Sequence, residues 1–155
     1  MEILIGSDHG GYKLKQEIIK YLNELGHTVE DCGCYSEESC DYPDIAQDVA
    51  KKVLLKGKRA ILVCGTGTGM SVVANKFKGV YAALCRNYTD AKYSRAINNA
   101  NVLCMGGWIT GKDAGVAITD VFLETEFTQD LEDWRAANLK KAYAGIQEME
   151  NEIYR

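Results

Sequence analysis

The chain has 155 residues, a length that fits one compact domain with a single core. Its formal net charge of −4 argues against a broad surface for nucleic acid, although a local cationic pocket for one phosphate is compatible with it. No apolar run approaches the roughly 20 residues that span a bilayer, and the first residues lack a signal-peptide pattern. We therefore expect a cytoplasmic protein that contacts neither nucleic acid nor membrane.

Six cysteines without a secretory signal are typical of reduced thiols rather than of a disulfide framework. Cys32, Cys34 and Cys40 lie close together, so a metal site is one interpretation of this segment. Structural zinc sites need four well-spaced ligands, and the only histidine nearby is His27. We expect no metal and interpret the three cysteines as small residues of a turn after a strand.

Short apolar runs alternate with longer amphipathic ones along the whole chain. In chain order they predict strand 2–7, helix 12–26, strand 27–33, helix 41–57, strand 59–64, helix 70–77, strand 79–85, helix 89–99, strand 100–107, helix 109–127 and helix 129–155. Gly26 is expected to close the first helix, and Asp41 to be the N-cap of the second.

Nearly continuous apolar strands that alternate with helices predict a parallel sheet covered on both faces. The predicted fold is a three-layer α/β/α Rossmann-like sandwich with five parallel strands, in one domain over residues 1–155. Such sheets bind ligands at the carboxyl ends of their strands. We expect 7–11, 64–71, Gly106–Gly107 and the asparagines near the last strand (Asn98, Asn99, Asn101) to converge on one edge.

The segment 64–71, C-G-T-G-T-G-M-S, is the most informative of these. Its alternating glycines allow a tight turn that directs several N–H groups at one point, and a helix begins directly after it. No lysine follows Gly69, so the segment is not a P-loop, and Met70 occupies a position that a dinucleotide fingerprint gives to glycine. The pattern is typical of an anion-stabilising turn.

Cys64 is the first residue of this segment, directly before the glycines, where a helix N-terminus favours the thiolate. A thiolate beside N–H donors suits a reaction that removes a proton and holds the resulting oxyanion. The alternative is an inert apolar cysteine at the end of a buried strand. Asp8 and His9 add an acid and a titratable ring after the first strand, although Asp8 is also a candidate helix cap. Tyr42 is likewise either a packing residue at the start of a helix or a substrate contact.

Several motifs occur in the order found in one known family. They are G-S-D-H-G-G-Y-K-L-K near the start, D-Y-P at 41–43, C-G-T-G-T-G-M-S at 64–71, A-N-K at 74–76, S-R at 94–95 and N-V-L-C-M-G-G at 101–107. The chain thus resembles the ribose-5-phosphate isomerase B and galactose-6-phosphate isomerase family over about residues 3–127.

The resemblance implies an aldose–ketose isomerase that works through a cis-enediol, without metal or organic cofactor. It also implies a homodimer or homotetramer in which two subunits build each active site. By position, Cys64 resembles the family's base, and the turn with Thr66 resembles the cradle of the enediolate oxygen. The implied substrate contacts are Asp8, His9, Tyr42, Gly65, Gly67, Gly69 and Asn98.

Two departures from the family are visible. The pentose isomerases carry a ring-opening histidine before the asparagine, in S-R-x-H-N, where this chain has Ile97. Their arginine-rich phosphate-binding segment is also absent, and after Phe127 the nearest cations are Arg135, Lys140 and Lys141. Arg135 is therefore only a candidate phosphate contact.

Isoleucine at position 97 has three interpretations. The substrate is already open-chain, as a tetrose 4-phosphate is; or another residue or water opens the ring; or a partner subunit supplies the histidine. The third interpretation fits a further resemblance. The B-type subunit of galactose-6-phosphate isomerase is similar to this chain in having an arginine, here Arg86, after the fourth strand. Arg86 is a candidate anion contact, with a solvated or helix-capping cation as the alternative.

The leading prediction is an isomerase of carbohydrate metabolism with ribose 5-phosphate of the pentose phosphate pathway as the default substrate. Galactose 6-phosphate and tetrose phosphates are the alternatives. A second class is a non-catalytic partner subunit of a hetero-oligomeric isomerase, and a third is a cysteine hydrolase activated by His9 or His27. The final helix, within 128–155, is predicted to lie at a subunit interface because its many charges do not suit a core position.

Overall fold

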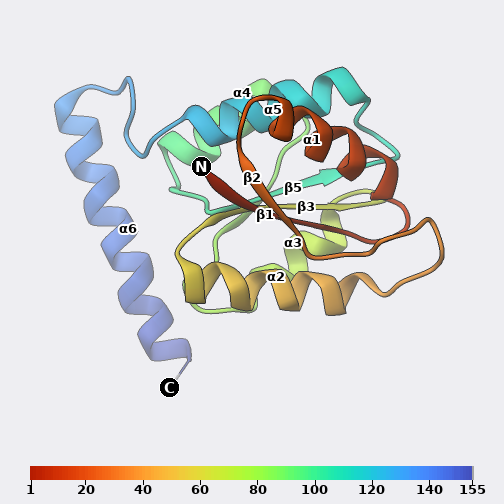
Figure 1. Ribbon diagram of the computed structural model, residues 1–155. Helices are drawn as coiled ribbons and strands as arrows, with labels where there is room; N and C mark the ends of the chain where they lie inside the picture. The colour runs from red at the N-terminus through yellow and green to blue at the C-terminus, as the bar shows by residue number, and fades with distance from the viewer. Residues whose placement is uncertain (155) are drawn as a thin grey trace.

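In a computed structural model that describes residues 1–154, five parallel strands form one sheet in the order β2-β1-β3-β5-β4 (Figure 1). The strands are β1 (Glu2–Ser7), β2 (Thr28–Asp31), β3 (Arg59–Cys64), β4 (Ala82–Leu84) and β5 (Val102–Gly106). The helices are α1 (Tyr12–Glu24), α2 (Tyr42–Lys56), α3 (Thr68–Ala74), α4 (Tyr88–Ala96), α5 (Lys112–Glu124) and α6 (Asp133–Ile153). The predicted order of elements is confirmed.

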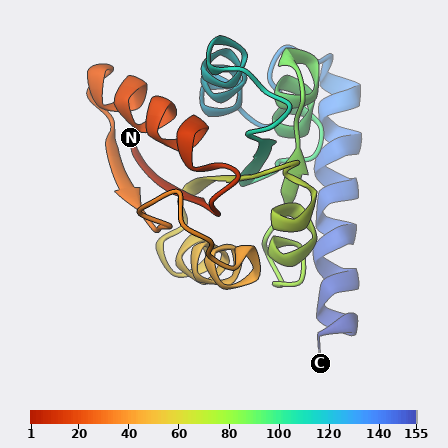
Figure 2. The same ribbon diagram turned by 90° about the vertical axis from the view of Figure 1, so that its right-hand side faces the viewer.

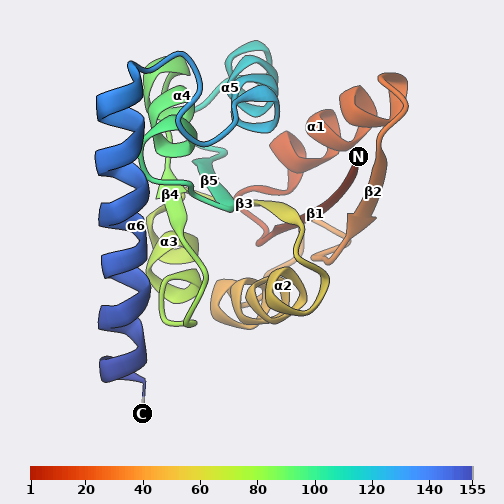
Figure 3. The same cartoon turned by 90° about the vertical axis from the view of Figure 1, so that its left-hand side faces the viewer.

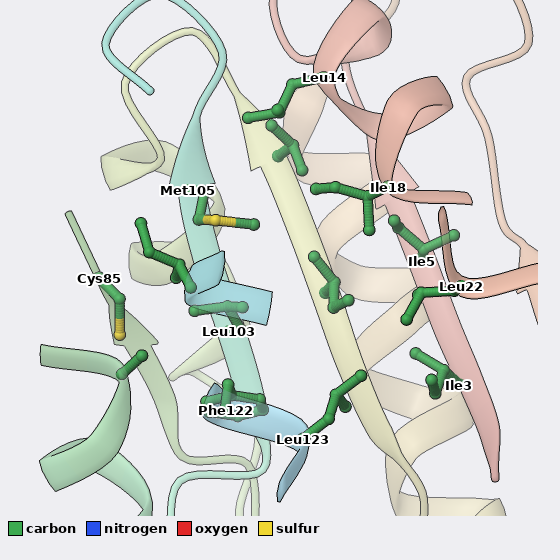
Figure 4. Close-up of a cluster of buried hydrophobic side chains, with 14 of the residues drawn as sticks. Ile3, Ile5, Leu14, Ile18, Leu22, Cys85, Leu103, Met105, Phe122 and Leu123 are labelled. Atoms are coloured by element: carbon green, nitrogen blue, oxygen red, sulfur yellow. The ribbon is translucent and has the colours of Figure 1, made fainter. Parts of the chain in front are cut away.

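Two apolar clusters, one on each face of the sheet, hold the three layers together. Helices α1, α4 and α5 pack on one face and α2 and α3 on the other (Figure 2). In the larger cluster, Leu14, Ile18 and Leu22 of α1 contact the strands beside Phe122 and Leu123 of α5 (Figure 4). The spacing of the α1 residues places them on one helix face. The predicted α/β/α sandwich is thus confirmed.

The two edge strands are shorter than the sequence predicts. β2 and β4 pair on one side only, and residues next to β4 bond to side chains instead. The backbone N–H of Tyr81 donates to Asn101 Oδ1 at 2.8 Å, and that of Gly79 donates to Glu150 Oε1 at 3.1 Å. An apolar pattern cannot reveal such side-chain partners, so the prediction extended the strand over 79–85.

The predicted caps are confirmed in position. Gly26 follows α1 in the left-handed region with φ 82°. Asp41 is the N-cap residue of α2, but its side chain makes no capping hydrogen bond. Asn87 does cap α4, since its Oδ1 accepts from the N–H of Asp90 at 2.9 Å.

The carboxyl ends of β1, β3 and β5 lie next to one another. Ser7 pairs with Val63, and Cys64 with Gly106. Because the chain passes to opposite sides of β1 when it forms β2 and β3, the switch in strand order lies between β1 and β3. This is where a parallel sheet opens a crevice for ligands.

The prediction that Asn98, Asn99 and Asn101 share this edge is wrong within one chain. They lie between the end of α4 and the start of β5, at the amino edge of the sheet. In parallel strands, the residues before a strand and those after it lie at opposite edges. Four residue steps from Val102 to Gly106 separate these edges by about 13 Å.

Helix α6 runs along the β4 side of the sheet, beside α3 and α4 (Figures 2 and 3). It is held there by Tyr143, whose ring contacts those of Tyr81 and Phe127, and by Glu150, which accepts from the Tyr81 hydroxyl at 2.7 Å. None of its residues is buried. Over residues 1–154, no helix has the length and apolarity needed to cross a membrane.

Candidate active site

Cys64 is the last residue of β3 and is 5% exposed. Its Sγ accepts a hydrogen bond from the backbone N–H of Gly67 at 3.0 Å. Its carbonyl accepts from the N–H of Gly107 at 2.7 Å, which ties the end of β3 to the loop after β5. An N–H directed at sulfur stabilises the negative charge of a thiolate, so the arrangement favours Cys64 as a base.

The turn after Cys64 is tightly packed against β4 and β5. Gly67 has φ 81°, and a Cβ there would lie 2.6 Å from a methyl of Leu84 and 2.8 Å from the carbonyl carbon of Met105. Helix α3 begins at Thr68 instead of at Met70 as predicted, so the glycine turn is itself the helix start. Preorganised N–H groups of this kind stabilise an oxyanion without first having to reorient.

Thr66 and Tyr42 lie on the solvent side of this turn. Thr66 is exposed, and its Oγ1 accepts from the N–H of Thr68 at 3.4 Å. The ring of Tyr42, at the start of α2, lies against Gly69, where a Cβ would be 2.8 Å from Cε2. Tyr42 therefore reaches the turn from the α2 side, as a substrate contact would.

Asp8 and His9 follow β1 on the other side of the crevice. Asp8 is buried, and its Oδ1 accepts from the N–H of Gly11 at 3.1 Å, so one carboxylate oxygen holds the turn that precedes α1. His9 is exposed and lines a cavity of about 350 Å³ together with Lys13 and Trp108. The structure thus ties Asp8 to the turn before α1 and leaves the His9 ring open to a ligand.

Lys15 was not identified from the sequence. Although charged, it is fully buried, and its Nζ donates to Asp31 Oδ1 at 2.6 Å and to the carbonyl of Cys34 at 2.5 Å. These bonds fix the loop that leads from β2 to Tyr42. The sequence signal is weak, because a lysine in an amphipathic helix is ordinarily solvated.

The structure divides the predicted site residues into two groups. At the carboxyl edge of one chain lie Cys64, Thr66, Gly65, Gly67, Gly69, Asp8, His9, Tyr42 and Arg86. Arg86 is exposed after the edge strand β4, and its backbone N–H donates to Asp90 Oδ2 at 3.1 Å. Asn98 and Arg135 lie outside this group: Asn98 follows α4 at the amino edge, and Arg135 is in the first turn of α6. The group of site residues at the carboxyl edge of a single chain therefore contains neither Asn98 nor Arg135.

Three further cysteines, Cys40, Cys85 and Cys104, lie in surroundings that disfavour a thiolate. Burial raises the pKa of Cys85 to about 11 and that of Cys104 well above its ordinary value. Burial and the neighbouring Cys34 thiol raise the pKa of Cys40 to about 12. These thiols stay protonated at neutral pH. All six cysteines are free, and residues 1–154 contain no group of three side chains placed to hold a metal ion.

A family model described as ribose/galactose isomerase matches residues 3–139. The chain belongs to this family. The 4-deoxy-4-sulfo-D-erythrose isomerase of Clostridium sp. (strain MSTE9) is 45% identical to it over 157 residues, which cover 100% of this chain and 99% of the relative. Ribose-5-P isomerase B of Listeria innocua is 38% identical over 129 residues, covering 83% and 87%.

Solved structures agree with the sequence comparison. Ribose-5-phosphate isomerase B of Clostridium thermocellum has a TM-score of 0.90 and 40% identity, with 99% of both chains covered. Family and fold together make the protein an aldose–ketose isomerase of the sugar-phosphate isomerase type. Of the two histidines that the hydrolase alternative names, His27 lies at the amino edge, away from Cys64, where its Nδ1 is 3.4 Å from the N-terminal amine.

Proposed function

We propose that the protein isomerises an open-chain four-carbon sugar with an anionic group on its terminal carbon, a sulfonate or a phosphate. The observation that carries this proposal is Ile97, at the position where the family's pentose isomerases have their ring-opening histidine. An alkyl side chain cannot transfer a proton. A tetrose whose fourth carbon bears a sulfonate, or whose 4-hydroxyl is phosphorylated, cannot close a five-membered ring and needs no such residue.

The full-length similarity to a 4-deoxy-4-sulfo-D-erythrose isomerase supports this choice, since that relative is named for such a four-carbon substrate. The small number of cationic side chains available for the anion also agrees with this choice of substrate. A phosphate monoester carries about 1.5 to 2 negative charges at neutral pH, whereas a sulfonate carries one. This chain lacks the family's arginine-rich segment, and a singly charged group needs fewer cations.

In the proposed mechanism Cys64, as thiolate, removes the proton from C2 of the aldose. The electron pair moves into the C1–C2 double bond and the C1 oxygen becomes an enediolate oxygen, which the N–H groups of the Gly65–Gly69 turn stabilise. A proton then passes from the C2 hydroxyl to the C1 oxygen, with the Thr66 hydroxyl beside them. Cys64 returns its proton to C1, and the ketose forms with no net gain or loss of atoms.

The remaining contacts orient the chain of the sugar. His9 faces the cavity at the end of β1 and is the proposed partner of the terminal anion. Tyr42, Asp8 and Asn98 are the proposed hydroxyl contacts. Arg86 and Arg135 are candidate anion contacts. Six free cysteines support a reducing compartment, and we propose the cytoplasm.

We propose that a second copy of this chain completes each site. Asn98 and Arg135 belong to the predicted site but lie away from Cys64 in their own chain, so only another subunit can bring them there. The exposed outer face of α6 supports a subunit contact: Ile146, Met149 and Ile153 follow one another at helical spacing. A homodimer is the smallest assembly with this property, and a tetramer would be a pair of such dimers.

The substrate is tested by a coupled isomerase assay on 4-deoxy-4-sulfo-D-erythrose, D-erythrose 4-phosphate and D-ribose 5-phosphate. We expect kcat/KM to be higher for both four-carbon sugars than for the pentose. A preference for ribose 5-phosphate would contradict the proposal and favour the second candidate, a pentose isomerase of the pentose phosphate pathway, which the 40% identity to a ribose-5-phosphate isomerase B supports.

Shared sites are tested by mixing two impaired variants, Cys64→Ala and Asn98→Ala. In a mixed dimer, one site carries both substitutions and the other carries neither. Mixing at equal concentration should restore about a quarter of the wild-type rate once subunits exchange. Activity that stays at the mean of the two variants would show that Cys64 and Asn98 do not meet across an interface.

A further inference from the structure

Trp108, in the loop between β5 and α5, is 73% exposed although it lies next to the catalytic turn. A Cβ at Gly65 would lie 2.7 to 2.8 Å from three consecutive atoms of the indole, Cδ2, Cε3 and Cζ3. A point almost equally distant from three neighbouring ring atoms lies above the face of the ring and not off its edge. The indole thus covers the backbone of the residue that follows the base.

The same ring also reaches the loop after β1. A Cβ at Gly10 would lie 3.3 Å from Trp108 Cε2. Gly10 is the neighbour of His9, and Gly65 is the neighbour of Cys64. The indole therefore bridges the residue beside the proposed anion contact and the residue beside the base.

The backbone around Trp108 is fixed to the turn that it covers. The N–H of Trp108 donates to the carbonyl of Gly65 at 3.0 Å, and the N–H of Gly107 donates to that of Cys64 at 2.7 Å. Two successive bonds of this kind prevent the loop from moving away independently. The backbone that carries the indole is thus held at the edge of the sheet.

The cavity of about 350 Å³ beside the indole joins an aromatic wall to polar side chains. Its lining combines Trp108 with His9, Lys13 and Glu37. Lys13 has only an exposed ion pair, with Glu37 at 3.5 Å, which water screens and an anion can replace. An aromatic face gives a sugar's C–H groups an apolar wall.

We infer that Trp108 is a specificity-determining residue that limits the substrate to four carbons. In the proposed function the reacting carbons lie at Cys64 and the terminal anion at His9, and the indole lies against Gly65 and Gly10, the residues next to these two. A five-carbon sugar needs more room between the same two points. This inference rests on the proposed function, because it assumes a four-carbon substrate.

The test compares Trp108→Ala with the matched control Trp108→Phe, which keeps an aromatic wall. The quantity measured is the ratio of kcat/KM for D-erythrose 4-phosphate to that for D-ribose 5-phosphate. One methylene in a pocket changes specificity about 10- to 200-fold, so Trp108→Ala should lower the ratio by about 10-fold or more. Trp108→Phe should keep a ratio near that of the wild type.

A binding measurement shows directly whether the sugar lies on the indole. Trp108 and Trp134 are the two tryptophans of the chain, so Trp134→Phe leaves Trp108 as the single tryptophan. With Cys64→Ser added to stop turnover, D-erythrose 4-phosphate should change the Trp108 emission with saturation. Inorganic phosphate should change it less, because it reaches only the anion end.

The outcomes separate this inference from the function on which it rests. Four-carbon preference in the wild type that persists unchanged in Trp108→Ala overturns the role of Trp108 alone. Saturable binding without any change in emission overturns it as well. A wild-type preference for ribose 5-phosphate overturns the four-carbon substrate and the role of Trp108 together.

Discussion

Replacing Gly67 with alanine tests whether the catalytic turn is as tightly constrained as its packing indicates. The backbone has φ 81°, a conformation that costs an L residue about 1 to 2 kcal/mol. The new methyl would lie 2.6 Å from Leu84 Cδ1 and 2.9 Å from the carbonyl oxygen of Met105. Overpacking of this kind costs about 1 to 3 kcal/mol. We expect Gly67→Ala to lower the free energy of unfolding by about 3 kcal/mol in urea titrations.

The same substitution should reduce turnover. The N–H of Gly67 donates to Cys64 Sγ at 3.0 Å, and relief of the overlap must move this donor. Loss of one preorganised donor costs about 100- to 1,000-fold in kcat. The coupled isomerase assay, run below the temperature at which the variant unfolds, measures this loss separately from the change in stability.

Gly26→Ala is the matched control. Gly26 has φ 82°, almost the same as Gly67, but nothing lies within 4 Å of a Cβ there. The free energy of unfolding of Gly26→Ala should therefore fall only by the conformational cost, about 1 kcal/mol, and the variant should keep its full kcat. If Gly67→Ala were no less stable than Gly26→Ala, or equally active, the turn would be more adaptable than its contacts indicate.

Two further substitutions test other parts of the structure. Lys15→Met leaves Asp31 and a loop carbonyl without their buried partner and should lower the free energy of unfolding by about 3 kcal/mol in urea; an unchanged midpoint would contradict the anchoring role. Ion pairs with Lys56 and Lys52 lower the pKa of Glu30 below 4.5, so the stability it contributes is present above about pH 4.5 and is lost as the pH falls through the lowered pKa. Glu30→Gln should remove that pH dependence, an effect below about 1 kcal/mol, in melts recorded against pH.

The order of elements and the glycine turn could be predicted because both are local signals. Strand 59–64 is a continuous apolar run, and its predicted bounds agree with Arg59–Cys64. The first and last residues of the edge strand β4 could not be predicted in this way. Its neighbours satisfy their backbone groups through Asn101 and Glu150, which lie far from it in the sequence.

The candidate site shows the same limit. The motif around Cys64 predicted the residues of the turn, but the relative positions of distant residues depend on the direction of the strands. Asn98 precedes β5 and therefore lies at the edge opposite Cys64 in its own chain. The role of Lys15 and the bridging position of Trp108 depend on contacts between loops, for which residue type alone gives no signal.

Proton transfer by Cys64 is tested most directly by solvent exchange. D-erythrose 4-phosphate is incubated in heavy water with the wild type or with Cys64→Ala, and nuclear magnetic resonance follows the hydrogen on C2 of the recovered aldose. We predict that deuterium enters C2 with the wild type and, with Cys64→Ala, no faster than without enzyme. Exchange by Cys64→Ala at the wild-type rate would show that another group moves the proton.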